Sequence, residues 1–121
     1  MKNKVVSLVI ALMLSVSFSF GQTESKNRDV FCQIIVQQKF LSKKMQMWID
    51  YGEESKWFAD KRVRDEQSGK VKSFNSQVDA LNYMSEEGWT YVNSFVVTQT
   101  TSFGTTVQFY YLLKREIPIE E

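Results

Sequence analysis

Alternation of apolar and polar side chains, with a period of two, is the pattern that most constrains how this chain folds. In residues 30–40 the apolar side chains fall on one face: Val30, Cys32, Ile34, Val36 and Phe40. In residues 45–51 a second set does the same: Met45, Met47, Ile49 and Tyr51. Such alternation is typical of strands with one buried face. Because only a short polar break at Ser42 and Lys43 separates the two runs, they predict an antiparallel hairpin.

The same period returns toward the end of the chain. Residues 89–100 are rich in β-branched and aromatic side chains, which favours a strand. Residues 106–115 predict another strand with one apolar face, made by Val107, Phe109, Tyr111 and Leu113. Gly104 lies in the loop that joins these two strands.

A helix is predicted between the two pairs of strands. Ser76 is a suitable N-cap, and Asp79 stands three residues later in a position typical of a capping box. The expected buried stripe consists of Val78, Leu81 and Met84, with Ala80 beside it. Gly88 favours a left-handed helix stop, and Trp89 is then placed to pack back near Met84.

These elements predict an α+β domain with an antiparallel sheet of about four main strands in the order β-β-α-β-β. One helix is expected to cover one face of the sheet, which leaves the other face wet unless something covers it. Residues 60–74 can form an extra small hairpin, with Gly69 in its turn, or a mobile loop. The hairpin is the favoured reading of this segment.

The N-terminus has the pattern of a cleavable secretory signal peptide over residues 1–21. Lys2 and Lys4 precede an apolar run from Val5 to about Val16, and small residues follow up to Gly21. A membrane anchor is the alternative, but the run is shorter than the roughly 20 apolar residues of a spanning helix. Cleavage is therefore expected between Gly21 and Gln22. Residues 22–29 are a polar leader that we expect to be flexible, 30–116 one domain and 117–121 a tail.

Composition argues against several classes of binding partner and against an internal disulfide. Removing residues 1–21 from the 121 leaves 100 residues, with 13 basic and 14 acidic side chains and a net charge of −1. That balance argues against nucleic acid and against a polybasic membrane surface as partners. The one cysteine, Cys32, cannot form an internal disulfide and is expected to be buried and inert.

The chain lacks the residues that most catalytic sites require. There is no histidine, which removes Ser-His-Asp triads, Cys-His pairs and histidine metal sites. Asp60, Asp65 and Glu66 lack the spacing of a calcium loop and alternate with basic residues. No spacing selects a carboxylate pair for a hydrolase. We therefore expect neither an enzyme nor a cofactor.

Aromatic side chains are the feature that points to binding. Trp48 falls on the outward face of its strand, and Phe31, Ile35, Tyr110 and Leu112 are out of phase with their strands' core faces. They predict an apolar patch on the second face of the sheet, which either makes contacts or is covered by the central loop with Trp57 and Phe58. The candidate binding residues are Trp48, Trp57, Phe58 and Tyr110; no metal ligands are proposed.

The stretch from Ala80 to Val92, with Leu81-Asn82 followed by Gly88-Trp89, resembles short bacterial domains of unknown function that end on a Lys-Arg pair, here Lys114-Arg115. The chain is similar to small secreted proteins of Bacteroidetes-type bacteria and, more distantly, to domain-of-unknown-function family 4177. The resemblance implies a sheet-plus-helix fold in a Gram-negative cell envelope. It implies no catalytic residue, ligand or cofactor.

The expected function is that of a periplasmic or secreted domain that works by contact with a protein partner or with itself. A module that binds glycan or peptide through exposed aromatic side chains is one alternative. A carboxylate-based hydrolase is the other, less favoured one. No membrane contact is expected once the signal peptide is removed.

Overall fold

The computed structural model describes residues 2–4, 26–54, 56 and 59–120. The chain divides into a larger unit, Asn27–Ile117, and a smaller one formed by Met1–Lys26 with Pro118–Glu121. In the smaller unit residues 2–4 are helical, and the amide of Ile119 donates to the carbonyl of Lys26 at 3.0 Å. The proposed cleavage between Gly21 and Gln22 lies outside the described residues, as do Trp57 and Phe58.

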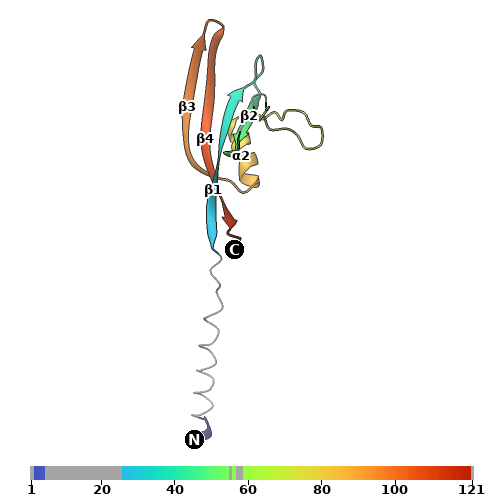
Figure 1. Ribbon diagram of the computed structural model, residues 1–121. Helices are drawn as coiled ribbons and strands as arrows, with labels where there is room; N and C mark the ends of the chain where they lie inside the picture. The colour runs from blue at the N-terminus through green and yellow to red at the C-terminus, as the bar shows by residue number, and fades with distance from the viewer. Residues whose placement is uncertain (1, 5–25, 55, 57–58, 121) are drawn as a thin grey trace. The chain divides into compact units, whose positions relative to one another are not determined.

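The larger unit contains a four-stranded antiparallel sheet, as the alternation predicted. Its strands are β1 (Asn27–Gln38), β2 (Met45–Asp50), β3 (Thr90–Thr101) and β4 (Gly104–Pro118). The order across the sheet is β2-β1-β4-β3, so the two hairpins meet along β1 and β4. Gln37 contacts Gln108 and Asp29 contacts Lys114, which shows that β1 and β4 also run in opposite directions. Figure 1 shows the β3–β4 hairpin extending past the β1–β2 turn at the same end of the sheet.

Strand limits differ from the pattern at the start of β1 and the end of β4, which lie side by side in the sheet. β1 begins at Asn27, inside the expected leader, and β4 continues to Pro118, inside the expected tail. Each strand provides the other with a hydrogen-bonding neighbour, and the Asp29–Lys114 pair, 3.5 Å apart, lies in this extension. Strand length is therefore set here by the neighbour rather than by the strand's own alternation.

The helix is a minor part of the fold. Helix α2 (Gln77–Glu86) has ten residues and lies between β2 and β3 in the sequence. The predicted order β-β-α-β-β describes the chain only approximately, because residues 2–4 are also helical. Among the described residues no helix combines the length and the apolar character needed to cross a membrane.

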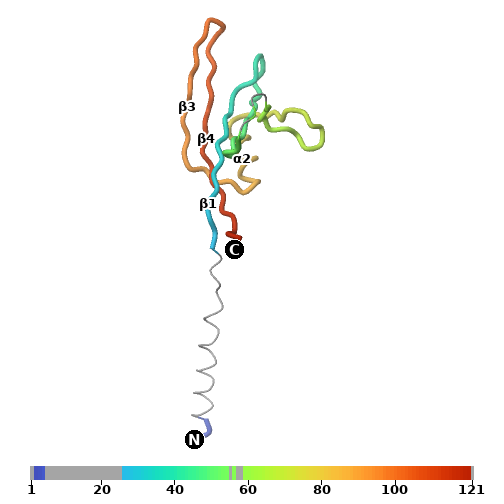
Figure 2. Tube along the Cα trace, in the orientation of Figure 1, coloured from blue at the N-terminus to red at the C-terminus, as the bar shows by residue number. Residues whose placement is uncertain are grey.

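Residues 60–74 form a bridged arm and contain no regular strand. Isolated antiparallel bridges join Arg64 to Val71, Trp48 to Arg62 and Met45 to Phe74. The first of these closes a small turn in which the amide of Gly69 donates to the carbonyl of Asp65 at 2.9 Å. The other two pair the ends of the arm with the outer edge of β2. Figure 2 shows the arm, in yellow-green, looping away from the sheet.

The core lies between α2 and one face of the sheet. Its buried members are Cys32, Ile34, Val36, Met47, Phe74, Ala80, Met84, Trp89 and Leu113. Three of them alternate along β1, as the period of two predicted. Because all nine lie within residues 32–113, a chain that begins at Gln22 retains the complete core.

Four residues that the patterns assigned to buried faces are exposed: Phe40, Tyr51, Val78 and Val107. Val78 is 64% exposed, because α2 turns its Ala80 and Met84 side chains, four residues apart, toward the sheet. Phe40 is 90% exposed, because β1 ends at Gln38 and the chain turns before the alternation can continue. Burial also declines along β4, from Leu113 to Val107, as the strand passes beyond the part of the sheet that α2 covers.

Both ends of α2 have the predicted caps. The Ser76 hydroxyl accepts from the amide of Asp79 at 3.2 Å, while the Asp79 carboxylate accepts from the amide of Asn75 at 2.8 Å. At the other end Gly88 has a φ of 90°, and the amide of Trp89 donates to the carbonyl of Met84 at 3.1 Å. This is the Schellman arrangement, which brings Trp89 back onto the last turn.

Arg115, the second residue of the Lys-Arg pair, completes this helix end. Its guanidinium lies 4.4 Å from the centre of the Trp89 ring, and its Nη1 donates to the carbonyl of Glu87 at 3.0 Å. It therefore satisfies a carbonyl that the helix leaves without an internal partner. The motif Gly88-Trp89 with Arg115 thus has a structural role in joining α2 to β4.

Candidate interaction surface

The second face of the sheet, opposite α2, carries an apolar patch. We call it the second-face patch; its members are Phe31, Ile35, Trp48, Phe95, Tyr110 and Leu112. Phe31, Phe95 and Leu112 are exposed, and the other three are half-buried. The patch crosses all four strands, so it belongs to the sheet as a whole.

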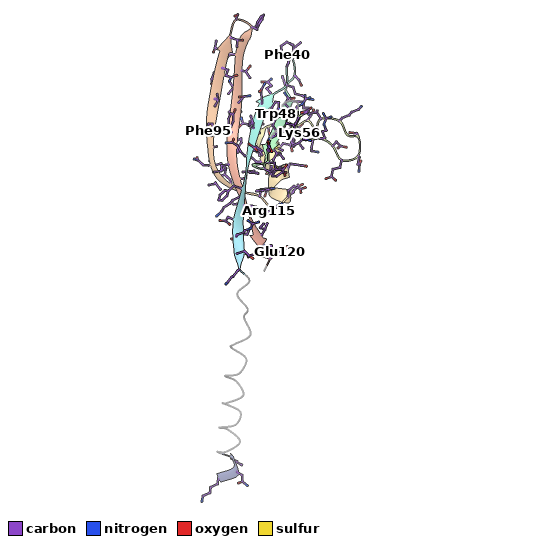
Figure 3. All side chains as sticks on the ribbon, viewed as in Figure 1. Phe40, Trp48, Lys56, Phe95, Arg115 and Glu120 are labelled. Carbon is purple, nitrogen blue, oxygen red and sulfur yellow. The ribbon has the colours of Figure 1, made fainter. Side chains whose placement is uncertain are left out.

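Register explains how these side chains come together. Ile35 lies opposite Trp48 in the β1–β2 pair, and Phe95 lies opposite Tyr110 in the β3–β4 pair. The Phe95 and Tyr110 rings are stacked, with centres 4.7 Å apart and planes 10° apart. Figure 3 shows Phe95 on the outer strand and Trp48 on β2. Trp48 and Tyr110, both predicted as binding residues, therefore share one face, with β1 between them.

Polar side chains in the middle of this face bond to one another. The Gln108 amide donates to Oε1 of Gln37 at 2.9 Å, and the Tyr110 hydroxyl donates to Oε1 of Gln108 at 3.2 Å. A small hollow of about 280 Å³ beside them is lined by Ile35, Trp48, Ile49, Asp50, Lys61 and Gln108. This ladder holds the Tyr110 ring in place against Phe95.

Phe95 is the member of the patch that the sequence pattern did not reveal. In β3 the register shifts between Tyr91 and Asn93, where a bulge leaves Val92 without a direct partner. Tyr91 lies opposite Leu113 on the core face, but after the bulge Phe95 lies opposite Tyr110 on the second face. A strict period of two from Trp89 would have placed Phe95 on the core face.

The outer strand of the sheet is open. Among the residues that the structure describes, β3 pairs only with β4, and every side chain from Thr90 to Thr101 is exposed except that of Val97. No charged residue and no proline occurs between Thr90 and Leu113. Edge strands of native sheets are usually protected by lysine, proline or a covering segment. The opposite edge has such a cover, because the amide of Val63 donates to the carbonyl of Met47 at 2.8 Å.

Asp60 and Cys32 are titratable groups whose surroundings shift their pKa values. The pKa of Asp60 lies far below its ordinary value because Arg62 donates to both carboxylate oxygens, and Arg64 bonds the same group at 2.8 Å. Burial raises the pKa of the Cys32 thiol to about 11, which keeps it protonated near neutral pH. Within the described ranges, no three Cys, Asp or Glu side chains gather in a way that could hold a metal ion.

No family model, curated protein or solved structure matches this chain. Functional inference therefore depends on the sequence and the geometry of the chain itself.

Proposed function

We propose that the chain is an exported, non-enzymatic domain of a Gram-negative cell envelope that works by self-association through β3 and the adjoining second-face patch. The observation that carries the proposal is the open edge of β3. Its twelve residues present one edge of backbone donors and acceptors with which no described strand pairs. The resemblance to small secreted bacterial proteins and the signal-peptide pattern supply the envelope part of the proposal.

A second copy of the chain is the partner that fits this edge. Two antiparallel copies of one strand complement each other, because each N–H of one faces a C=O of the other around a two-fold axis. β3 carries no charge, so the two copies would bring no like charges together. The result would be a continuous eight-stranded sheet in which the two second-face patches join.

Exposed apolar side chains support the pairing on both faces of β3. Val96, on the core-side face beyond α2, is 57% exposed, and Phe95, on the second face, is 53% exposed. Pairing of the edges would place both side chains against the partner's β3, each on its own face, with one residue of the strand directly opposite its own copy. Aromatic and β-branched cross-strand pairs contribute about 0.2–1 kcal/mol each relative to alanine pairs.

Sedimentation velocity on the chain from Gln22 tests the proposal, with Val96→Lys as the decisive variant. The wild type should show a monomer–dimer equilibrium, and Val96→Lys should raise the dimer Kd roughly tenfold, because it places like charges close together. Val78→Lys is the matched control, because Val78 is equally exposed but lies on α2. A wild type that remains monomeric at high concentration would refute the proposal, as would equal effects of the two variants.

A further inference from the structure

The turn between β1 and β2 holds two large apolar side chains out in solvent. Phe40 is 90% exposed and Leu41 is 89% exposed. The turn itself is well bonded: the amide of Lys39 donates to the carbonyl of Lys44 at 2.8 Å, and that of Ser42 to the carbonyl of Lys39 at 3.2 Å. The two side chains are thus presented by a defined turn. Figure 3 shows Phe40 at the end of this turn.

Leu41 adopts a backbone conformation that does not suit its side chain. Its φ is 55°, in the left-handed region where glycine or asparagine is favoured. No other residue in the described part of the chain combines a positive φ with a side chain larger than glycine's hydrogen. A turn selected for stability alone would place glycine here, so an exposed leucine suggests that the side chain itself is used.

The other turn at this end of the sheet has a similar apolar side chain. Phe103 lies between β3 and β4 and is fully exposed. Because the sheet is antiparallel, both turns lie at its same end (Figure 1). We call this end the basic tip; it consists of residues 39–44 and 102–103.

Charge at the basic tip has one sign. Lys39, Lys43 and Lys44 are its three charged residues. None of them takes part in an ion pair of the described residues; Lys39 donates to the Ser73 hydroxyl and Lys44 to the Asn75 amide oxygen. The nearby carboxylate of Asp79 is bonded to the amide of Asn75. The chain from Gln22 has a net charge near zero, so this local excess of positive charge is not evident from its composition.

A hollow of about 760 Å³ lies beside the turn. Its walls combine apolar side chains, Met45, Val107 and Phe109, with the lysines Lys39 and Lys43. Apolar contacts and positive charge are the two chemistries that a lipid headgroup and its first methylene groups require. The hollow therefore extends the amphipathic character of the basic tip.

We propose that the basic tip docks on the surface of an anionic phospholipid bilayer. Phe40, Leu41 and Phe103 would enter the boundary between headgroups and acyl chains, while the three lysines contact lipid phosphates. A bilayer fits better than a folded protein or nucleic acid, because protruding apolar side chains need a soft apolar medium rather than a matching cavity or a duplex. This departs from the expectation of no membrane contact, which rested on net charge. It does not depend on self-association.

Vesicle flotation tests the proposal on the chain from Gln22, which retains the complete core and lacks the apolar N-terminal run. The protein should float with vesicles of phosphatidylcholine and phosphatidylglycerol and much less with phosphatidylcholine alone. Phe40→Ser with Leu41→Ser should lower the partition coefficient about 100-fold, roughly tenfold per side chain. Lys43→Glu should lower it roughly 20-fold, and about 1 M salt should abolish the preference for anionic lipid.

Matched controls distinguish docking at the basic tip from general adhesion. Tyr51→Ser removes an exposed aromatic side chain that follows β2 at the end away from the basic tip, and Lys70→Glu makes the same charge change on the arm; both should float like the wild type. Equal flotation with neutral vesicles, equal losses in the controls, or no flotation at all would each overturn the proposal. Sedimentation of the same variants keeps the two proposals apart, because the tip variants should self-associate normally.

Discussion

Arg115 is the side chain whose replacement most sharply tests how the helix is joined to the sheet. Its guanidinium lies 4.4 Å from the centre of the Trp89 ring and donates to the carbonyl of Glu87 at 3.0 Å. A cation–π contact at a partly exposed site contributes about 0.5–1 kcal/mol, and we take about 1 kcal/mol for the charged hydrogen bond because Arg115 is only half-buried. Arg115→Ala should therefore lower the free energy of unfolding by about 2 kcal/mol.

Thermal and urea unfolding of the chain from Gln22, followed by circular dichroism, measure this loss. For a domain of this size about 2 kcal/mol corresponds to a decrease in Tm on the order of 10 °C. Lys114→Ala is the control, because Lys114 makes only an exposed ion pair with Asp29 at 3.5 Å and should change Tm little. Equal effects of the two variants, or an Arg115→Ala variant as stable as the wild type, would refute this account of the helix end.

Three further predictions concern the core and the helix stop. Met47→Ala, at a fully buried position, should cost about 2–5 kcal/mol in urea unfolding; a cost below 1 kcal/mol would mean that the core is assigned wrongly. Gly88→Ala should lower the free energy of unfolding by about 1–2 kcal/mol, because φ is 90° and the new Cβ would approach Cδ of Arg115 to 3.3 Å. Gly52→Ala is the control: its φ is 79° but no atom lies near the new Cβ, so it should lose only the free energy of the backbone strain. Cys32 has a pKa of about 11 when folded and near 9.0 when unfolded, so its contribution to stability should be complete below pH 9 and disappear as the pH rises through 11. The same thiol should react with a disulfide reagent only on unfolding, and fast labelling of the native protein would contradict its burial.

The sequence predicted those elements whose signals are local. Ser76 and Gly88 mark the ends of the helix because a cap depends only on the few residues around it. The strands were predicted because alternation along β1 and β4 directly reflects one buried face. The buried face of α2 was predicted only in part: Val78 and Ala80 are both apolar, and only packing against the sheet selects Ala80.

The parts that the sequence did not reveal depend on partners distant in the chain. The bulge between Tyr91 and Asn93 reverses the phase of β3 and moves Phe95 to the second face, and no residue type marks it. The exposure of Phe40 follows from where β1 ends, which depends on the turn to β2. The patch on the second face was predicted through Trp48 and Tyr110, whereas Trp57 and Phe58 lie outside the described residues.

Disulfide scanning along β3 tests the central claim of self-association most directly. In a Cys32→Ser chain from Gln22, single cysteines are placed in turn at the five residues Ser94, Phe95, Val96, Val97 and Thr98. Antiparallel pairing about a two-fold axis puts one residue opposite its own copy, with Cα atoms about 4.5–5.5 Å apart, within the range of a disulfide. We expect one position to give a sharp maximum of disulfide-linked dimer that declines on both sides. A flat profile, no higher than that of Val78→Cys on α2, would contradict pairing through β3.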